Sequence, residues 1–325
     1  MFGGVYRNKR VLVTGHTGFK GSWLCKWLNH LGAEVFGYSL NPSTEPNHFD
    51  LSNPKVNSHI NNIQDLNSVK DFISKSEPEI IFHLAAQPLV IESYKEPLET
   101  FTTNVIGTAN VLEAAKENNV TDRLIDFSTS EVFGSMAFKS SETDSTVAGS
   151  AGEARWTYAV SKLAGEHLAH AYYKQFNLPC VTVRPFNVYG PGQTGEGAIQ
   201  IFIKKALKNE TISIDGDGNQ IRAWCYVDDF VDCIMECIEN PVAIGESFNI
   251  GNARAVITIL GLANTVCRVL NSSSKIIHEP PLSADIAIRI PSVEKIEQKL
   301  GIKAKVDLEE GIQKTADWMK NNLVI

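Results

Sequence analysis

An α/β fold is predicted, with a doubly wound parallel sheet followed by a smaller C-terminal α+β lobe. Up to residue 187, short and nearly continuous apolar runs alternate with amphipathic helical segments, which is typical of parallel strands covered by helices on both faces. After residue 187, glycine and polar residues become frequent, as in "NVYGPGQTGEGAIQ", and the helical segments become shorter. The cleft between the two parts is the expected ligand site.

The individual elements follow from local patterns. The β-branched run "RVLVTG" at 10–15 predicts the first strand, and apolar residues at helical spacing from Trp23 to Leu31 predict a helix that ends at Gly32. Further strands are predicted at 34–39, 79–86, 123–130 and 179–187, and further helices near 66–76, 97–118 and 157–176.

The chain is expected to divide into two parts. Residues 1–186 form the main layer, and 222–239 has the pattern of a strand running into a helix, so that 222–255 returns to this layer. The lobe then consists of 187–221 and 256–325, in which "EPPLSADIAIRIP" has the composition of a loop.

Composition excludes several classes of partner. The chain has 325 residues, a net charge of −7 and no block of Lys or Arg, so a nucleic-acid partner is not expected. No apolar run reaches the ~18 residues that span a membrane, and the N-terminus is too short and polar for a signal peptide. A soluble cytoplasmic protein is therefore expected.

Cysteines and histidines give no sign of a disulfide or a metal. The six cysteines form no CxxC pair and lie mostly in apolar periodic stretches, which suits reduced core residues. The eight histidines are scattered and form no HxxxH or HxH pair with a carboxylate. No metal site is predicted.

The glycine-rich segment "TGHTGFKG" predicts a phosphate cradle. Gly15 allows a tight turn, Gly18 lets a pyrophosphate approach the backbone, and Gly21 lets helix and strand pack closely. The start of the following helix adds partial positive charge. Because a strand precedes the motif and a helix follows it, the motif predicts dinucleotide binding and a Rossmann-type fold.

The sequence leaves the choice between NAD and NADP open. A site that prefers NAD usually has Asp or Glu after the second strand, where it holds the ribose 2′-hydroxyl. Here the segment reads "GYSLNPS", with Ser39 and no acid. Lys20 lies nearby in the sequence and could tolerate a 2′-phosphate.

"YAVSK" and "STSE" predict an oxidising centre. Tyr158 and Lys162 are four residues apart on a predicted helix and so share one face. The lysine's charge favours the phenolate, which makes Tyr158 a base for a sugar or alcohol hydroxyl while hydride leaves the same carbon. Thr129, at the end of an earlier strand, could hydrogen-bond the same hydroxyl.

These motifs together resemble the extended short-chain dehydrogenase/reductase family, in the branch that modifies nucleotide-activated sugars. The matching pieces run in order along nearly the whole chain: "VTGHTGFKGSWL", "HLAAQ", "TNVIGT", "STSEVFG", "YAVSK", "RPFNVYGPG", "RAWCYVDD" and "DLEEGIQKT". The resemblance implies that the main layer binds NAD or NADP and that the lobe binds a nucleotide-diphosphate sugar. It also implies a homodimer through helices 97–118 and 157–176.

The resemblance further implies a role for each matched position. Cofactor contacts would come from Gly15, Thr17, Gly18, Phe19, Lys20, Gly21, Ser39, Asp65 (toward the adenine), Leu66, Leu84, Ala85, Ala86, Gln87, Asn104, Tyr158 and Lys162. The catalytic residues would be Thr129, Ser130, Glu131, Tyr158 and Lys162. Asn187 and Arg222, and as a weaker candidate Arg289, would hold the diphosphate of the sugar nucleotide.

The resemblance divides between members of this branch. The N-terminal third is similar to CDP-glucose 4,6-dehydratases, but these typically have Thr-Asp-Lys where this chain has Thr129, Ser130 and Glu131. Thr-Ser-Glu is instead similar to GDP-mannose 4,6-dehydratases and UDP-glucuronate decarboxylases.

Chemistry favours a 4,6-dehydratase with a tightly bound nicotinamide. After oxidation at C4, the C5 proton needs a base, and Glu131 can supply it. The alternatives are a decarboxylase, in which Ser130 and an arginine receive a C6 carboxylate, and a 4-epimerase, which needs no third acid–base residue. A nicotinamide-binding sensor or scaffold is the alternative outside enzymes, although the required Tyr, Lys, Thr and Glu are all present.

Overall fold

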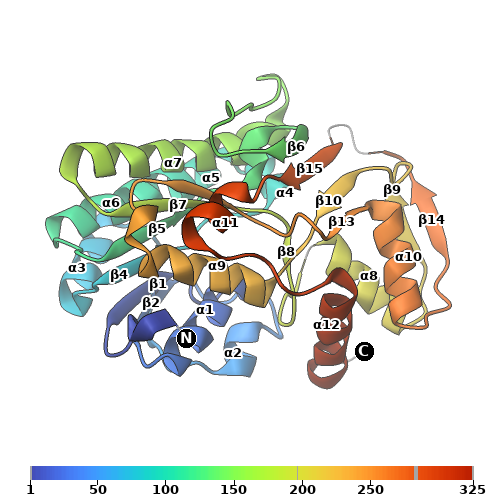
Figure 1. Cartoon of the computed structure of the whole chain (residues 1–325), viewed down its shortest axis with the longest axis horizontal. Helices are drawn as coiled ribbons and strands as arrows, with labels where there is room; N and C mark the ends of the chain where they lie inside the picture. The colour runs from blue at the N-terminus through green and yellow to red at the C-terminus, as the bar shows by residue number, and fades with distance from the viewer. Residues whose placement is uncertain (1, 196, 282–284, 324–325) are drawn as a thin grey trace.

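The computed structural model shows a seven-stranded parallel sheet as the centre of the protein, and it describes residues 2–195, 197–281 and 285–323 (Figure 1). The strand order is β12-β7-β5-β4-β1-β2-β3, and every neighbouring pair is parallel. The strands are β1 Arg10–Thr14, β2 Glu34–Ser39, β3 Asn57–Ile60, β4 Ile80–His83, β5 Arg123–Phe127, β7 Cys180–Pro185 and β12 Ser247–Ile250. The predicted doubly wound, Rossmann-type fold is confirmed.

Helices cover both faces of this sheet (Figure 1). Helices α1 (Phe19–His30) and α9 (Val227–Glu239) bury Leu24 and Ile234 in the core with the strands on one face. Helices α3 (Leu66–Ser76), α6 (Gly107–Glu117) and α7 (Thr157–Phe176) cover the other face. Successive strand side chains alternate between these two cores, which explains why the strand sequences are apolar on both faces.

The helix predicted at 97–118 is divided into three pieces. It comprises α5 (Pro97–Phe101), a π-helical turn (Thr102–Ile106) and α6, and the shorter α4 (Val90–Lys95) precedes it. Inside the π-turn, the Asn104 side chain accepts from the Gln87 N–H at 2.8 Å and donates to Ser161 Oγ at 2.9 Å on α7. The turn thus joins the segment after β4 to the helix that carries Tyr158.

The lobe has a second, four-stranded sheet in the order β13-β10-β15-β6. Its strands are β6 Met136–Ser140, β10 Ile221–Ala223, β13 Val256–Thr258 and β15 Ile288–Pro291. β15 lies inside the segment expected to be a loop. It pairs in parallel with β6, which directly follows the main-sheet strand β5 and its 3₁₀ turn at Ser130–Phe133. Residues from both halves of the chain therefore build this sheet.

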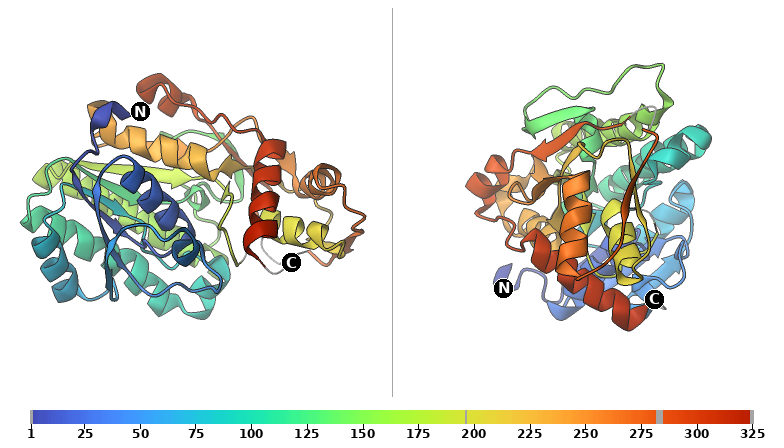
Figure 2. Two further views of the ribbon diagram at one scale, coloured as in Figure 1. Left: turned by 90° about the horizontal axis from the view of Figure 1, so that it is seen from below. Right: turned by 90° about the vertical axis from the view of Figure 1, so that its right-hand side faces the viewer.

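Three helices and two small two-stranded sheets complete the lobe. The helices α8 (Ala198–Leu207), α10 (Ile259–Val269) and α12 (Leu308–Asn322) contact one another at one end of the molecule (Figures 1 and 2). The small sheets pair β8 (Val188–Tyr189) with β11 (Cys225–Tyr226) and β9 (Ile212–Asp215) with β14 (Ile276–Glu279). The chain also contains the short helices α2 (His48–Ser52) and α11 (Glu294–Leu300). None of the helices in the described part of the chain is long and apolar enough to cross a membrane.

A buried ion pair fastens α7 to the sheet. Glu166 on α7 accepts from Arg184 Nε on β7 at 3.0 and 3.1 Å and from Ser247 Oγ on β12 at 2.8 Å. The two charged side chains are only 7% and 4% exposed. A buried charge without its partner is strongly unfavourable, so this pair holds α7, and Tyr158 with it, against β7 and β12.

Replacing Arg184 by leucine is expected to lower the free energy of unfolding by about 3–5 kcal/mol, because Glu166 would remain buried without its partner. Urea unfolding measures this change. Lys75→Met is the matched control, since it removes an exposed ion pair with Asp71 (side chains 74% and 62% exposed) and should change stability by less than about 0.5 kcal/mol. Equal effects of the two substitutions would contradict the expectation.

Candidate active site

The glycine-rich turn between β1 and α1 has the geometry of a phosphate cradle. Gly15 has φ +72°, and a Cβ on it would lie 2.8 Å from the Ala85 backbone nitrogen. A Cβ on Gly21 would lie 2.2 Å from the Gly15 carbonyl oxygen. Gly18 is the N-cap residue of α1 and no side chain caps it, and the N–H groups of a first helical turn favour an anion. The close approach of these backbones requires glycine, and the cradle fits a dinucleotide pyrophosphate.

Several predicted cofactor residues lie at the carboxyl ends of the neighbouring strands. At the end of β2, Ser39 Oγ is 2.8 Å from Thr17 Oγ1, and Thr17 donates to the Leu40 carbonyl oxygen. Asp65 caps α3 by accepting from the Ser68 N–H at 3.1 Å. Phe19 and Leu66 are the first residues of α1 and α3, and Leu84, Ala85, Ala86 and Gln87 follow β4 directly.

Lys20 lies in a different environment from the one that the sequence suggested. Its ammonium is 5.7 Å from the centre of the Phe230 ring, and its other electrostatic neighbours are Cys225 and Lys162. Burial, together with repulsion from Lys162, lowers the pKa of Lys20 to about 8. None of these neighbours belongs to the end of β2, where a ribose 2′-phosphate would lie, so accommodation of a 2′-phosphate by Lys20 is not supported.

Thr129 and Tyr158 meet where β5 ends. Thr129 Oγ1 accepts from the Glu131 N–H at 3.2 Å and hydrogen-bonds the Tyr158 phenol. Burial raises the pKa of Tyr158 to about 12, and the negative charge of Glu131 adds to this, whereas the Thr129 hydrogen bond opposes it. Lys162 lies one helical turn further on, is 2% exposed, and has a pKa lowered by burial. The phenol therefore needs nearby positive charge before it can act as a base.

Glu131 is held between two arginines. Its carboxylate pairs with Arg155 Nη1 at 2.8 Å and, at still shorter range, with Arg289 Nη1. Burial favours the neutral acid, but the two guanidinium groups outweigh burial and lower the pKa of Glu131. Glu131 is thus ionised at neutral pH. Ser130, beside it, is 4% exposed within the 3₁₀ turn.

Arg289 was expected to hold the diphosphate of the substrate, but in the structure its guanidinium contacts groups of the protein. Besides Glu131, its guanidinium donates to the Gly134 carbonyl oxygen at 3.2 Å. Arg222, on the neighbouring strand β10, pairs with Asp285 at 3.3 Å. Burial and the nearby Arg289 lower the pKa of Arg222 to about 10, while Asp285 opposes this change.

The Asn187 amide lies close to this group of arginines. It donates to the Ala223 carbonyl oxygen, next to Arg222, at 2.9 Å. Arg155, Arg222 and Arg289 gather here with Glu131 and Asp285. A group of arginines favours an anionic ligand.

Sequence reasoning missed Arg155 and Asp285. Arg155 reaches the Glu131 carboxylate because it lies in a 3₁₀ turn (Ala154–Trp156) that leads directly into α7. Its position three residues before Tyr158 was the available signal, since one helical turn separates the two side chains. Asp285 reaches Arg222 through a long-range contact between β10 and the segment before β15, and no local pattern indicates such a contact.

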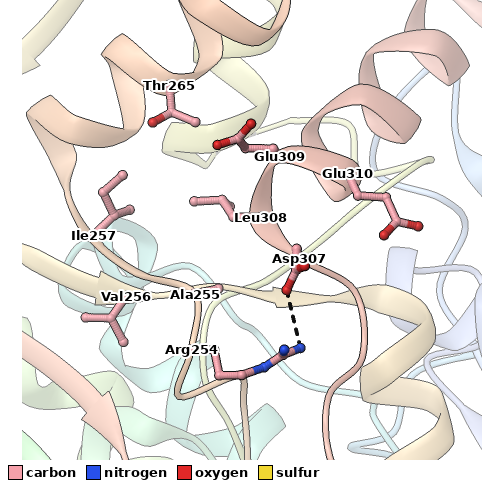
Figure 3. A pocket seen from close by; sticks show the side chains of 9 residues that line it. All are labelled: Arg254, Ala255, Val256, Ile257, Thr265, Asp307, Leu308, Glu309 and Glu310. Carbon is pink, nitrogen blue, oxygen red and sulfur yellow. Dashed lines mark ion pairs between the residues drawn. The ribbon is translucent and has the colours of Figure 1, made fainter.

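A separate hollow in the lobe does not coincide with these residues. This cavity of about 530 Å³ is lined by residues of β13, α10 and the start of α12, including Arg254, which pairs with Asp307 at 3.4 Å (Figure 3). None of the predicted site residues lines it. In the described residues, no group of three or more His, Cys, Asp or Glu could hold a metal.

The comparison with known families identifies the family of the chain. Residues 11–251 match the model of the NAD dependent epimerase/dehydratase family. The chain belongs to this family. The family is NAD-dependent, so the cofactor is NAD. The chain is therefore an enzyme of the nucleotide-sugar epimerase, dehydratase and decarboxylase group.

The relatives of this chain are named for different reactions. CDP-glucose 4,6-dehydratase of Salmonella typhimurium is 34% identical over 68% of this chain and 64% of its own length. UDP-N-acetyl-alpha-D-glucosaminuronate decarboxylase of Bacillus cytotoxicus is 32% identical over 96% of this chain and 98% of its own. The structure of UDP-glucuronic acid 4-epimerase from Bacillus cereus, in complex with UDP-glucuronic acid and NAD, has a TM-score of 0.85 at 28% identity, over 96% of this chain and 99% of its own.

Lys20→Met is expected to weaken NAD binding by about 10-fold, because it removes a positive charge from the first turn of α1, whose N-terminus is the expected pyrophosphate site. Binding of AMP, which lacks the pyrophosphate, should change less than about twofold. Calorimetric titration at pH 7 measures both, since a Lys20 with a pKa of about 8 is protonated there.

Lys26→Met is the matched control for this substitution. Lys26 lies on the same helix, with its ammonium 5.5 Å from the centre of the Trp23 ring. The Lys26→Met variant should bind NAD with the affinity of the unsubstituted protein. An equal loss of affinity for AMP and NAD in Lys20→Met would show that Lys20 acts on the fold of the site and not on the pyrophosphate.

Proposed function

We propose that this enzyme is a nucleotide-sugar 4,6-dehydratase. It would oxidise the sugar at C4, eliminate water across C5 and C6, and reduce C6. The observation that supports this proposal is an ionised Glu131 directly beside the Thr129–Tyr158 pair. An epimerase needs no such third acid–base group, whereas an elimination does.

In the oxidation step, Tyr158 takes the proton of the C4 hydroxyl. Thr129 hydrogen-bonds the same hydroxyl and the phenol, and the Lys162 ammonium favours the phenolate. NAD, when bound, would supply the hydride acceptor for C4 and the hydride donor for C6. Burial of Tyr158 and Lys162 limits access of water to this exchange.

In the elimination step, Glu131 removes the proton from C5. That proton is acidic because a ketone has formed at C4. The C6–O bond breaks as the C5–C6 double bond forms, and the hydroxyl leaves as water with the proton that Glu131 took. When C6 is reduced, C5 takes a proton from solvent, and Tyr158 releases to solvent the proton that it took from the C4 hydroxyl. The arginines Arg155 and Arg289 keep Glu131 ionised and oriented, and Ser130 lies beside it in the same turn.

A decarboxylase is the second candidate, and the arginines at Glu131 are the observation that favours it. A C6 carboxylate could bridge the guanidinium groups of Arg155 and Arg289, which already hold one carboxylate. The C4 ketone would make such a sugar a β-keto acid, which loses carbon dioxide and then needs only a proton at C5. The 96% overlap with a glucosaminuronate decarboxylase agrees with this candidate.

The diphosphate of the substrate is proposed to lie against Arg222 and the Asn187 amide. Arg222 has a single carboxylate partner among the described residues, Asp285, and Arg289 is engaged with Glu131. An anionic diphosphate would compete with Asp285 for the guanidinium. This arrangement places the nucleotide on the lobe and the sugar toward β5.

A homodimer through α5, the π-turn and α7 is also proposed. Large apolar side chains are exposed along these elements, with Leu98 at 81%, Ile106 at 49% and Val160 at 39%. Exposed apolar surface of this kind marks association surfaces. Light scattering on the purified protein should give twice the mass of the 35.8 kDa chain, and Leu98→Glu with Ile106→Glu should give a monomer.

Product mass decides between the two candidate reactions. The purified enzyme is incubated separately with CDP-glucose, GDP-mannose, UDP-glucuronate, UDP-N-acetylglucosamine and dTDP-glucose. We expect loss of one water from one of the neutral sugars. Loss of carbon dioxide from the glucuronate would replace the dehydratase by a decarboxylase, and an unchanged mass with a new retention time would indicate epimerisation.

Substitutions separate the two steps of the proposed reaction. Tyr158→Phe is expected to lower turnover at least 10²-fold, because the phenol is the base for C4 oxidation. Glu131→Gln should still permit oxidation, seen as absorbance at 340 nm, but should release no dehydrated product. Tyr172→Phe is the control on the same helix, since that phenol binds Glu113 at 2.9 Å. Full turnover by Glu131→Gln would contradict the role of Glu131.

A further inference from the structure

Asp126 is a buried acid that the proposed reaction does not use. It lies on β5, three residues before Thr129, and its side chain is 0% exposed. Alternation along β5 places Ile125 and Phe127 in the core beneath α1 and α9, and Leu124 in the core beneath α6 and α7. Asp126 therefore faces α7, the helix that carries Tyr158 and Lys162.

The neighbouring strands leave this carboxylate without a hydrogen bond. Neither Asp126 oxygen accepts a hydrogen bond from a side chain among the described residues, and the Phe127 N–H is the one backbone group that favours the ionised carboxylate. His83 on β4 is opposite Asp126, but its two ring nitrogens lie 2.8 Å from Thr14 Oγ1 and 3.0 Å from Thr108 Oγ1. Burial lowers the pKa of His83 to about 3, so the imidazole is neutral. On β7, Thr182 is opposite Asp126.

The remaining charged groups of this layer identify the partner of Asp126. Glu166 on α7 and Arg184 on β7 are paired with each other, and the Cys180 thiol on β7 is neutral because burial raises its pKa. Lys162 on α7 has no ion pair among the described residues. The carboxylates that act on it are Asp126 and Glu166, and the titratable groups Lys20 on α1 and His83 on β4 are also within electrostatic range. Since Arg184 already balances Glu166, Asp126 is the uncommitted negative charge behind Lys162.

We propose that Asp126 is a positioning residue that keeps Lys162 protonated and oriented toward Tyr158. A buried lysine tends to lose its proton, and a neutral lysine cannot stabilise a phenolate. An unpaired buried carboxylate lowers the stability of the fold. Its effect on the charge of Lys162 would explain why it is present. The proposal concerns C4 oxidation, which dehydratases, decarboxylases and epimerases share, so it holds even if the elimination role of Glu131 is wrong.

The proposal predicts the direction of a pH effect. Burial raises the pKa of Asp126 to about 6, so the carboxylate is ionised above that pH and supports the Lys162 charge there. Activity at high pH ends when Lys162 loses its proton. Without the Asp126 charge, Lys162 loses its proton at lower pH, and the alkaline limb of the pH–rate profile moves down.

Asp126→Asn tests this prediction. The rate of C4 oxidation is followed at 340 nm in a single turnover between pH 6 and pH 10, with whichever nucleotide sugar of the five named above reacts fastest. We expect the alkaline limb to move down by about one pH unit, which is a tenfold loss of rate above the limb. The melting temperature is recorded beside the profile, because Asp126→Asn removes one buried charge and also leaves Lys162 without its balancing charge.

Three further variants keep the test decisive. Thr182→Val changes the opposite residue on β7 without changing charge and should leave the limb in place. Asp126→Glu retains the charge and should largely restore the limb. If Asp126→Asn does not fold, Asp126→Val supplies an apolar side chain for the same buried position and should show the same shift.

An unmoved alkaline limb in Asp126→Asn would overturn the proposal, whatever happens to the absolute rate. So would a fall in melting temperature with an unchanged profile, since that combination indicates a purely structural residue. Product mass is independent of this readout. A shifted limb combined with an epimerised product would therefore refute the dehydratase while retaining the role of Asp126.

Discussion

The ion pair between Glu131 and Arg289 is the contact on which the geometry of the site depends. It joins the turn that ends β5 in the main sheet to β15 in the lobe, across 158 residues of sequence. β15 also pairs with β6, which starts only a few residues after Glu131, so the ion pair and the strand pairing support each other. The orientation of Thr129 and Ser130 is set in the same turn, because Thr129 accepts from the Glu131 N–H. The two parts of the protein are thus connected at the atoms where the sugar is expected to react.

This connection between the two parts buries charged side chains, which is unfavourable unless each charge is paired. The buried charges are paired in different ways. Glu166 is satisfied by Arg184 and Ser247, so this group stabilises the fold. Glu131 is satisfied by two arginines that come from separate elements. Asp126 makes no side-chain hydrogen bond, and its charge acts on Lys162, which belongs to the oxidising centre. Perturbed titration of this kind is typical of functional sites.

Local signals in the sequence predicted much of the fold. The helices 66–76 and 157–176 begin and end at the predicted residues, and the glycines of the cradle could be assigned from their spacing. β15 was missed because its few residues pair only with distant strands. The π-turn was missed because "TTNVI" has no composition that distinguishes it from α-helix.

The candidate site was predictable only where its residues fall in contiguous motifs. Thr129, Glu131, Tyr158 and Lys162 belong to such motifs, whereas Arg155 and Asp285 reach their partners through tertiary contacts. The position of Lys20 shows the same limit: nearness in sequence to the second strand did not place its side chain there. Charges that meet across the fold cannot be paired from sequence spacing alone.

The π-turn has a consequence for how this family member can tolerate insertions and deletions. A π-turn is equivalent to one residue added to an α-helix, and each residue turns a helix by ~100°. Loss of one residue between Thr102 and Ile106 would let α5 and α6 join as a regular helix, but it would change the direction of the side chains within the turn relative to the flanking helices. Asn104 could then no longer reach Gln87 and Ser161 while Thr108 still reached His83. The length of this segment is therefore as constrained as the identity of its residues.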